Sequence, residues 1–538
     1  MGASFNLVDE PWILVMDRDG AVHEVSLRDA FRLAPAFRQI VGEVPTQSFA
    51  ILRLLLAILH RAVQGPSSVG EWLELRDDWE AACETVSRYL ETFRGRFDLR
   101  HPDEPFFQVA GLRSASGEVS GLEKLIADVP NGAPYFTTRL GRGLERITWS
   151  EAARWLVHVH AFDPSGIKTG AVGDPRVKGG KGYPIGPAWV GQIGGVSLVG
   201  ENLAETLLLN LIVPESAGVL SGPDDLPPWE RPQLDQRADD SNGGEPRGFL
   251  DLYTWQARRV RLAGDDDGVT GVVIAQGDRA TPHNRHVFEP MTAWRFSENQ
   301  TRATGTETYM PRAHQAERQF WRGLEALLPS AVATSGTGPR AVLPPGVLSW
   351  AAELREAGLL EGFVRVRAVG VEYGPQSSTY AEILDDELVL PAAVVADGAL
   401  AQVCVDAVRV ADKAVGTFAS LAKNIASASG GAPDDSGPGD RARERGFAAL
   451  DPEFRRWLVG LGTAPEPRAH LAAWHELVRA TVGRLGAQVV ANAGPAAWRG
   501  REVRGKHLDL GKAEVWFRAA LRGATELAEQ GAAQEVTA

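Results

Sequence analysis

Cysteine is nearly absent from this sequence. Only Cys83 and Cys404 occur in 538 residues, and each lies in an apolar, periodic stretch. Two such residues cannot build a disulfide framework or a thiolate zinc site, so the composition fits a reducing compartment. The opening MGASFNLVDEPW lacks the basic and apolar regions of a signal peptide, and no apolar run approaches the roughly eighteen residues of a membrane span. We therefore expect a cytoplasmic protein that neither crosses nor enters a membrane.

Positive charge is also scarce. The chain has 56 basic and 69 acidic residues and a formal net charge of -13, so the molecule as a whole should not attract polyanions. Lysine is especially rare, with eight residues, yet Lys168, Lys178 and Lys181 fall within fourteen positions. Residues 165–200 contain four basic residues, Arg176 among them, against one acidic residue. The sign of the charge is reversed locally, and any nucleic acid would have to meet this patch.

The motifs of common enzyme classes are missing. Gly180-Lys181 is followed by Gly182 rather than by serine or threonine, which excludes a Walker phosphate loop. No GxSxG motif, catalytic Cys and His signature or dinucleotide fingerprint occurs. We expect no catalytic residue, no metal and no cofactor.

Some residues keep an enzymatic alternative open. Histidine pairs and acidic runs are used as ligands in metal-dependent nucleases and nucleotide hydrolases, although structural histidines and solvated turns explain them more simply here. The residues concerned are His158 with His160, His283 with His286, Asp265-Asp266-Asp267 and Asp385-Asp386. They would have to converge in space for this alternative to hold.

Residues 1–397 predict a mixed α+β domain with small sheets and helices. Asp19-Gly20, a hairpin-turn dipeptide, lies between two β-rich segments near the N-terminus. Residues 98–200 are rich in glycine and proline, and residues 222–246 have the composition of a linker or surface excursion. Helical spacing and β-rich runs predict helices at 46–63, 68–97, 149–160, 203–212 and near 314–328, and strands at 249–262, 269–276 and 287–296.

The last part of the chain differs in kind. Four alanine-rich segments carry apolar residues at three- and four-residue spacing and are separated by short connections rich in glycine and proline. They cover roughly 399–428, 440–461, 466–493 and 506–530. Residues 398–538 are therefore expected to form a separate all-α four-helix bundle.

A glycine-rich stretch, GDPRVKGGKGYPIGPAW at 173–189, is the first candidate for contact with nucleic acid. Gly179, Gly180 and Gly182 lack side chains, so their main chain can approach a narrow groove while Lys178 and Lys181 neutralise phosphates. A solvated glycine loop with incidental lysines is the other interpretation.

Two further stretches are candidates. Gly374-Pro375 marks a turn whose polar tip contains Gln376 and lies between the strand-like VRVRAVGVEY and TYAEIL; it is either a functional hairpin tip or an ordinary turn. In NGAPYFTTRLGRG, an exposed Phe136 beside Arg139 would stack on or clamp single-stranded nucleic acid. Burial of Phe136 in the core is the alternative.

Taken together, these features resemble the CasA family, the large subunits of the type I-E CRISPR Cascade surveillance complex, an antiviral defence assembly. The opening NLVDEPWILV is similar to the family's start, and GFLDLYTWQARRVRL (248–262) is similar to its central strand with a Trp-Gln pair. LAETLLLNLI resembles the helix after its glycine loop, and the C-terminal bundle is also shared. The similarity spans nearly the whole chain, and the order of the motifs carries it.

The resemblance implies a subunit without catalytic activity that recognises the protospacer-adjacent motif of double-stranded target DNA in the minor groove. It also implies help in opening the target, docking on other Cascade subunits, and a surface for a recruited helicase-nuclease. Carried over by position, the family's glycine loop corresponds to Gly179–Gly182 with Lys178 and Lys181 beside it, and its wedge glutamine corresponds to Gln376. Its aromatic loop, which grips the 5′ handle of the CRISPR guide RNA, most resembles the stretch around Phe136.

The sequence departs from the family pattern at two places. The family's minor-groove lysine lies downstream of the Trp-Gln pair, but AWRFSENQTRAT contains no lysine. Arg295, Asn299 and Arg302 are the possible replacements, and Asn299 belongs to the candidate set. Pro375 stands where some relatives have a polar residue, and the CxxC pair of some relatives is missing.

Overall fold

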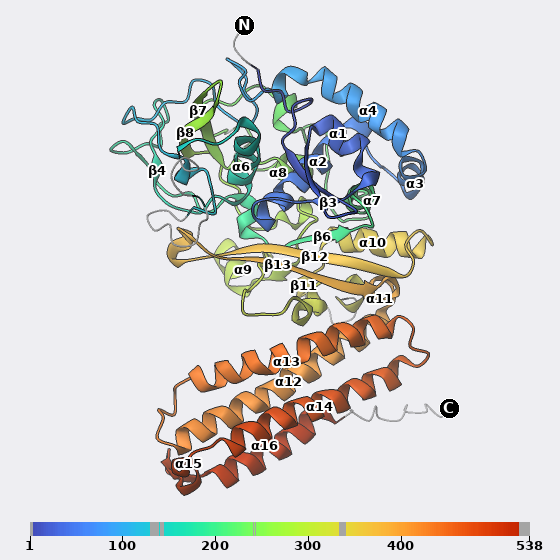
Figure 1. Ribbon diagram of the computed structural model, residues 1–538, viewed down its shortest axis with the longest axis vertical. Helices are drawn as coiled ribbons and strands as arrows, with labels where there is room; N and C mark the ends of the chain where they lie inside the picture. The colour runs from blue at the N-terminus through green and yellow to red at the C-terminus, as the bar shows by residue number, and fades with distance from the viewer. Residues whose placement is uncertain are drawn as a thin grey trace. The chain divides into compact units, whose positions relative to one another are not determined.

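The computed structural model describes residues 4–129, 139, 145–239, 241–242, 244–332 and 341–526 (Figure 1). The chain forms two compact units. The first comprises Met1–Phe320 and Thr334–Glu387, and the second comprises Trp321–Ala333 and Leu388–Ala538. The sequence places the boundary between residues 397 and 398. In the structure the main part of the second unit begins at Leu388, and the unit also includes the separate segment Trp321–Ala333.

A three-stranded antiparallel sheet opens the first unit. Its strands β1 (Ile13–Asp17), β2 (Val22–Val25) and β3 (Phe37–Ile40) lie in the order β2-β1-β3. The predicted turn at Asp19-Gly20 is confirmed: the Asp17 carboxylate accepts two backbone N–H groups of the turn, and Gly20 has a φ of +87°. Glycine adopts this φ without steric cost, which is why the dipeptide forms a hairpin here.

Helices form the core of the first unit. They are α2 (Pro45–Val63), α3 (Val69–Asp77), α4 (Trp79–Thr92), α6 (Trp149–Phe162) and α7 (Leu203–Asn210), and they confirm four segments predicted from apolar spacing. α2 is buried along nearly its whole length and packs on α6. Among the described residues it is the one helix long and apolar enough to cross a membrane, and 83% of that window is buried inside the protein.

A buried ion pair lies at the centre of α2. Arg53 meets the carboxylate of Glu289 at 2.8 Å, both side chains are fully buried, and Trp189 Nε1 donates to the same carboxylate. Glu289 belongs to 287–296, which the sequence predicts to be one strand. That prediction is wrong for most of its length, because the chain turns inward to place Glu289 and only β9 (Trp294–Phe296) is extended.

Two other predicted elements differ from the structure. The sequence predicts one strand over 249–262, but α8 (Phe249–Tyr253) precedes β7 (Arg258–Asp265). The Asp225 carboxylate accepts the backbone N–H groups at the start of α8 and so caps a helix there. β7 pairs with β8 (Gly268–Gln276), which confirms the strand predicted at 269–276. The helix predicted near 314–328 is replaced by a 3-10 helix at Phe320–Ala326.

The polar turn at Gly374-Pro375 forms the end of a long antiparallel hairpin. β12 (Phe363–Tyr373) and β13 (Tyr380–Pro391) lie in a sheet of order β13-β12-β6, where β6 is Gly195–Val199. β12 pairs with β6 from Arg365 opposite Val199 to Val369 opposite Gly195. The hairpin predicted from the flanking sequence is therefore confirmed as a structure.

The second unit is a helical bundle, as the sequence predicts. Helices α12 (Gly398–Ala428), α13 (Gly437–Leu461), α14 (Pro467–Ala491) and α16 (Leu510–Thr525) lie side by side (Figure 1). Their aromatic core explains why the segment at 321–333 belongs to this unit: Trp321 stacks on Phe454 with ring centroids 4.2 Å apart. The fold class of a mixed α+β part followed by a helical bundle is confirmed, and the bundle also contains one short two-stranded hairpin.

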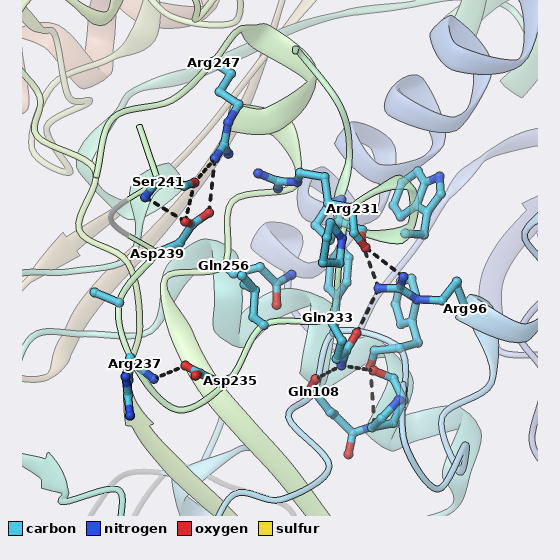
Figure 2. Close-up of a pocket in the computed structure, with 18 residues that line it drawn as sticks. Arg96, Gln108, Arg231, Gln233, Asp235, Arg237, Asp239, Ser241, Arg247 and Gln256 are labelled. Atoms are coloured by element: carbon cyan, nitrogen blue, oxygen red, sulfur yellow. Dashed lines mark hydrogen bonds and ion pairs between the residues drawn. The ribbon is translucent and has the colours of Figure 1, made fainter. Parts of the chain in front are cut away.

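The stretch at 222–246 is held against the first unit rather than hanging free. Figure 2 shows Arg96 and Gln233 on one side of a cavity of about 380 Å³. Arg96 donates to the carbonyl oxygens of Pro228 and Arg231 and to the side chain of Gln233. These bonds fasten the stretch at its middle, so it is a surface excursion and not a flexible linker.

Part of the positive charge that lines the cavity behind this excursion is compensated by carboxylates. On its other side, Arg247 pairs with Asp239, and the buried Asp251 lies 2.8 Å from Arg231 and 3.6 Å from Arg247. Gln256 lies between the two sides (Figure 2). The guanidinium groups of Arg231 and Arg247 are thus compensated within the protein, and we interpret the cavity as a packing feature of the excursion.

Candidate nucleic-acid interface

The glycine-rich stretch forms a tight hairpin. β4 (Lys168–Thr169) pairs with β5 (Lys181–Gly182), and Lys178 and Lys181 exchange two backbone hydrogen bonds of 3.1 Å around the turn. Gly179 and Gly180 have φ values of +58° and +73°, the left-handed conformation that a two-residue hairpin turn requires at both positions. A Cβ at either glycine would meet nothing within 4 Å. The glycines are therefore needed for the turn, and they leave its main chain bare.

The tip also carries the free lysines. Lys178, Gly179, Gly180 and Lys181 are all exposed, and neither lysine has an ion pair with any residue that the structure describes. Gly182 differs, because it is buried and a Cβ there would lie 3.2 Å from Gln276 Cγ. We define the hairpin tip as residues 178–181; Gly182 belongs to its packed base and is not positioned for a groove contact.

The local positive charge is smaller than the sequence suggests. Lys168 Nζ lies 2.6 Å from the carboxylate of Asp163, and the Lys168 side chain is 17% exposed. Arg176 chelates the Asp174 carboxylate and donates to two backbone carbonyls at the end of β8. Two of the four cations thus hold the hairpin in place, and only Lys178 and Lys181 face solvent freely.

Asp163 is the anchor beneath the hairpin tip. It lies just after α6 and is shared by Lys168 and the buried Arg258, whose Nε is 2.5 Å from the carboxylate. Burial alone would raise the pKa of Asp163, but Lys168 and Arg258 outweigh it and hold that pKa below its ordinary value. Burial also lowers the pKa of Lys168 despite the attraction of the carboxylate. Gln276 Nε2 adds a bond to Gly166 O at 2.9 Å.

Gln376 lies at the exposed end of the β12–β13 hairpin. Its φ is +58° and that of Ser377 is +54°, an uncommon conformation for residues other than glycine. Tyr373 and Tyr380, which flank the turn, both donate their hydroxyls to Phe162 O, at 2.6 and 3.1 Å. Burial raises the pKa of both tyrosines, so they remain neutral donors. The end of the hairpin is therefore rigidly based and carries an outward amide.

The two tips share one foundation. The Ser165 N–H donates to Ser377 O at 2.7 Å, next to Gln376, while Lys168, three residues on, begins β4 of the glycine hairpin. The short segment from Phe162 to Lys168 thus binds both hairpins within the first unit. Sequence reasoning missed these supporting residues, although the two tyrosines placed symmetrically about GPQSST were a usable signal.

The possible replacements for the family lysine lie on β9 and on α9 (Glu298–Thr304). Asn299 and Arg295 are exposed, and Arg302 pairs with Glu298 at 3.2 Å. Within the described ranges, no hydrogen bond or ion pair joins α9 to either tip.

The third candidate stretch gives a mixed result. Phe136 lies outside the described residues. Arg139 is not positioned for nucleic acid, because it pairs with Asp128 at 3.2 Å and with Glu151 at 2.5 Å, and its guanidinium lies 5.9 Å from the Trp155 ring. Its charge is compensated by two carboxylates, which its neighbours in sequence did not reveal.

The residues of the enzymatic alternative do not converge. His158 bonds to Thr46 Oγ1 and His160 to Phe107 O, and burial lowers the pKa of these histidines to about 3 and about 4. The acidic runs lie apart: Asp265 pairs with Arg146, Asp266 with Arg100 and Asp385 with Arg367. His286 packs against the rings of Trp294 and Tyr309. In the described part of the chain, no three His, Cys, Asp or Glu side chains are grouped to hold a metal.

Comparison with known proteins identifies the family. The family model of CRISPR-associated protein Cse1 matches residues 6–485. The chain belongs to the Cse1 family of CRISPR-associated proteins. A CasA/Cse1 protein of Thermus thermophilus is 33% identical over 392 residues, which cover 71% of this chain and 69% of the relative. The resemblance to CasA found in the sequence is confirmed.

Solved Cse1 structures share the whole fold. The crystal structure of Cse1 from Thermobifida fusca superposes with a TM-score of 0.89 at 43% identity, covering 97% of this chain and 98% of that one. Cse1 from Acidimicrobium ferrooxidans gives a TM-score of 0.79 at 32% identity, with 98% and 99% covered. A chain of a CRISPR RNA-guided surveillance complex has the same fold, with a TM-score of 0.70 at 20% identity and coverage of 96% and 99%.

Proposed function

We propose that this Cse1-family protein is the non-catalytic large subunit of a cytoplasmic CRISPR RNA-guided surveillance complex. In this role it recognises the protospacer-adjacent motif of double-stranded DNA in the minor groove and helps to open the adjoining base pairs for the guide RNA. Family membership and the shared fold support the assignment to such a complex. The exposed tip at 178–181 carries the assignment to motif recognition, because it combines bare main chain with two unpaired lysines.

The hairpin tip suits a shallow contact with the minor groove that has limited sequence selectivity. The minor groove is only about 6 Å wide and distinguishes A·T from G·C rather than all four base pairs. Main chain at Gly179 and Gly180 fits such a groove, and the exposed Lys178 and Lys181 beside it can neutralise phosphates. Because the guide RNA supplies the sequence specificity, the protein needs to read only a short element. Two lysines on a chain of net charge -13 give weak affinity for random DNA.

Gln376 is proposed to act as the wedge that enters the opened duplex. Hydrogen bonds from Tyr373, Tyr380 and Ser165 hold the base of its hairpin, so the tip is supported when it meets the duplex. The guide-RNA 5′ handle would be held by the stretch around Phe136. The bundle would contact neighbouring subunits, and the first unit would present the surface for a recruited helicase-nuclease.

The two tip lysines provide the test of motif recognition. In the assembled complex, Lys178→Gln with Lys181→Gln is expected to weaken binding to a motif-bearing duplex about tenfold and to reduce the salt slope of log K by about two, because two phosphate contacts are lost. Filter or anisotropy titrations from about 50 to about 300 mM salt measure both. Lys413→Gln with Lys423→Gln on α12 removes the same charge and should change neither. Equal effects of the two pairs would refute the assignment.

The wedge role predicts a defect at a different step. Gln376→Ala should slow opening of the target about tenfold while leaving the initial encounter nearly unchanged, since insertion compensates part of the cost of unstacking. Stopped-flow fluorescence of 2-aminopurine beside the motif separates these steps. Gln376→Gly should show the same defect although it relieves the positive φ. Gln64→Ala is the matched control, because Gln64 is also exposed and has a φ of +54°. An encounter defect without an opening defect would contradict the wedge.

A further inference from the structure

A second basic hairpin lies in the bundle, where the sequence predicts only a connection and the start of a helix. After α15 (Pro495–Arg499), strands β14 (Arg501–Val503) and β15 (Lys506–Leu508) pair antiparallel, and α16 begins only at Leu510. Arg504 and Gly505 form the turn with φ values of +50° and +74°. Figure 1 shows α15 at one end of the bundle.

The base of this hairpin is fixed. Arg501 donates to the carbonyl oxygens of Ser427 and Gly431 at the end of α12, at 2.7 and 2.5 Å. Ala497 is fully buried and Leu508 is 6% exposed, so both ends of the segment are packed into the bundle. The turn and the residues around it are therefore presented on a packed support.

The exposed part combines an aromatic ring with uncompensated charge. Trp498 is 63% exposed, whereas tryptophan side chains are on average highly buried in folded proteins. Arg499, Arg504 and Lys506 are exposed, and none of them forms a side-chain hydrogen bond or ion pair with the described residues. Residues 498–508 contain four arginine or lysine residues against one acidic residue, Glu502, in a chain of net charge -13.

We propose that Trp498, Arg499, Arg504 and Lys506 form a binding site for single-stranded DNA at this end of the bundle. An indole stacks on any base whose face is free, and nearby cations neutralise the sugar-phosphate chain; together they give binding that tolerates sequence. A duplex offers free base faces only at its ends, so the exposed tryptophan favours an unpaired strand. The choice of DNA rests on the proposed function, in which opening of the target releases one DNA strand.

The isolated full-length chain tests this site by fluorescence anisotropy with a labelled oligothymidylate of about twenty nucleotides in about 50 to 200 mM salt. Trp498→Ala should weaken binding about tenfold without changing the salt slope, because stacking is lost but no phosphate contact is. Arg499→Gln with Arg504→Gln and Lys506→Gln should weaken binding at least about tenfold and reduce the slope by about two. All four residues are exposed, so circular dichroism and the melting temperature should not change.

Matched variants decide the outcome. Trp516→Ala removes another exposed indole of the same unit, and Lys413→Gln with Arg441→Gln and Arg522→Gln removes three other exposed cations; both should bind the oligonucleotide normally.

No binding by the native chain, or equal loss in site and control variants, overturns the proposal. Unchanged binding with failure to enter the assembled complex shows a protein-docking surface instead. Tighter binding of oligouridylate than of oligothymidylate overturns the choice of DNA. Lys178→Gln with Lys181→Gln should leave this assay unchanged, so failure of motif recognition is distinguishable.

Discussion

Gly180→Asp is expected to abolish recognition of motif-bearing duplexes by the assembled complex, with a loss of affinity of at least about a hundredfold. The substitution places a carboxylate between Lys178 and Lys181, where it lowers the charge of the hairpin tip from +2 to +1 and meets the phosphates and base edges of the groove. A side chain also fills space that bare main chain leaves open. Anisotropy or gel-shift titrations of the complex against duplexes that differ only beside the target measure the loss.

The same substitution should leave the fold intact. A Cβ at Gly180 meets nothing within 4 Å, and aspartate tolerates the left-handed conformation better than most residues, so the cost is about 1 kcal/mol. Gly218→Asp is the matched control, since Gly218 is exposed, has a φ of +68° and has equally open surroundings. Gly180→Asn adds a side chain of nearly the same shape without the charge, so its affinity for the duplex should lie between those of the native protein and of Gly180→Asp. Native affinity of Gly180→Asp in a correctly assembled complex would disprove groove insertion.

Most of the helical architecture was predictable because helix formation leaves a periodic trace in local sequence. α2, α6 and the four bundle helices each bury one apolar stripe or more, and that pattern is visible without knowledge of the fold. The failures have long-range causes. α8 depends on a cap from Asp225, some twenty residues away, and Glu289 turns inward because Arg53 lies in α2. A sequence window contains neither partner.

The candidate site divides in the same way. The exposed glycine loop at 173–189 was expected, but its hairpin was not, although Gly179-Gly180 is one of the pairs that a two-residue turn with positive φ favours. The available charge was not predictable, since counting basic residues cannot show that Lys168 is held by Asp163 or that Arg139 is held by two carboxylates. Burial of a charge depends on partners brought together by the tertiary fold. The exposed tips depend on local turn residues and are visible in the sequence, whereas the residues that support them depend on the tertiary fold.

Asp163→Asn tests that foundation and is expected to lower the free energy of unfolding by about 3–5 kcal/mol, because Lys168 and the buried Arg258 lose their shared carboxylate. Urea unfolding of the full chain measures this free energy, and every transition in the unfolding curve is included. Since the pKa of Asp163 is lowered in the folded state, its stabilisation is present above about pH 4 and is lost as the pH falls through the folded pKa. The difference from the native protein should therefore be largest at neutral pH and shrink in acid.

Two companion variants show whether the loss arises from uncompensated charge. Asp163→Asn with Lys168→Met should recover about 1–3 kcal/mol of the single variant's loss, because one orphaned cation is removed from the buried cluster. Asp385→Asn breaks a more exposed pair with Arg367 in β12 and should cost less than about 1 kcal/mol. Because the segment from Phe162 to Lys168 supports both tips, Asp163→Asn should also weaken motif binding and slow target opening at temperatures where the chain stays folded. Undisturbed opening together with lost motif binding would show that the two hairpins are anchored independently.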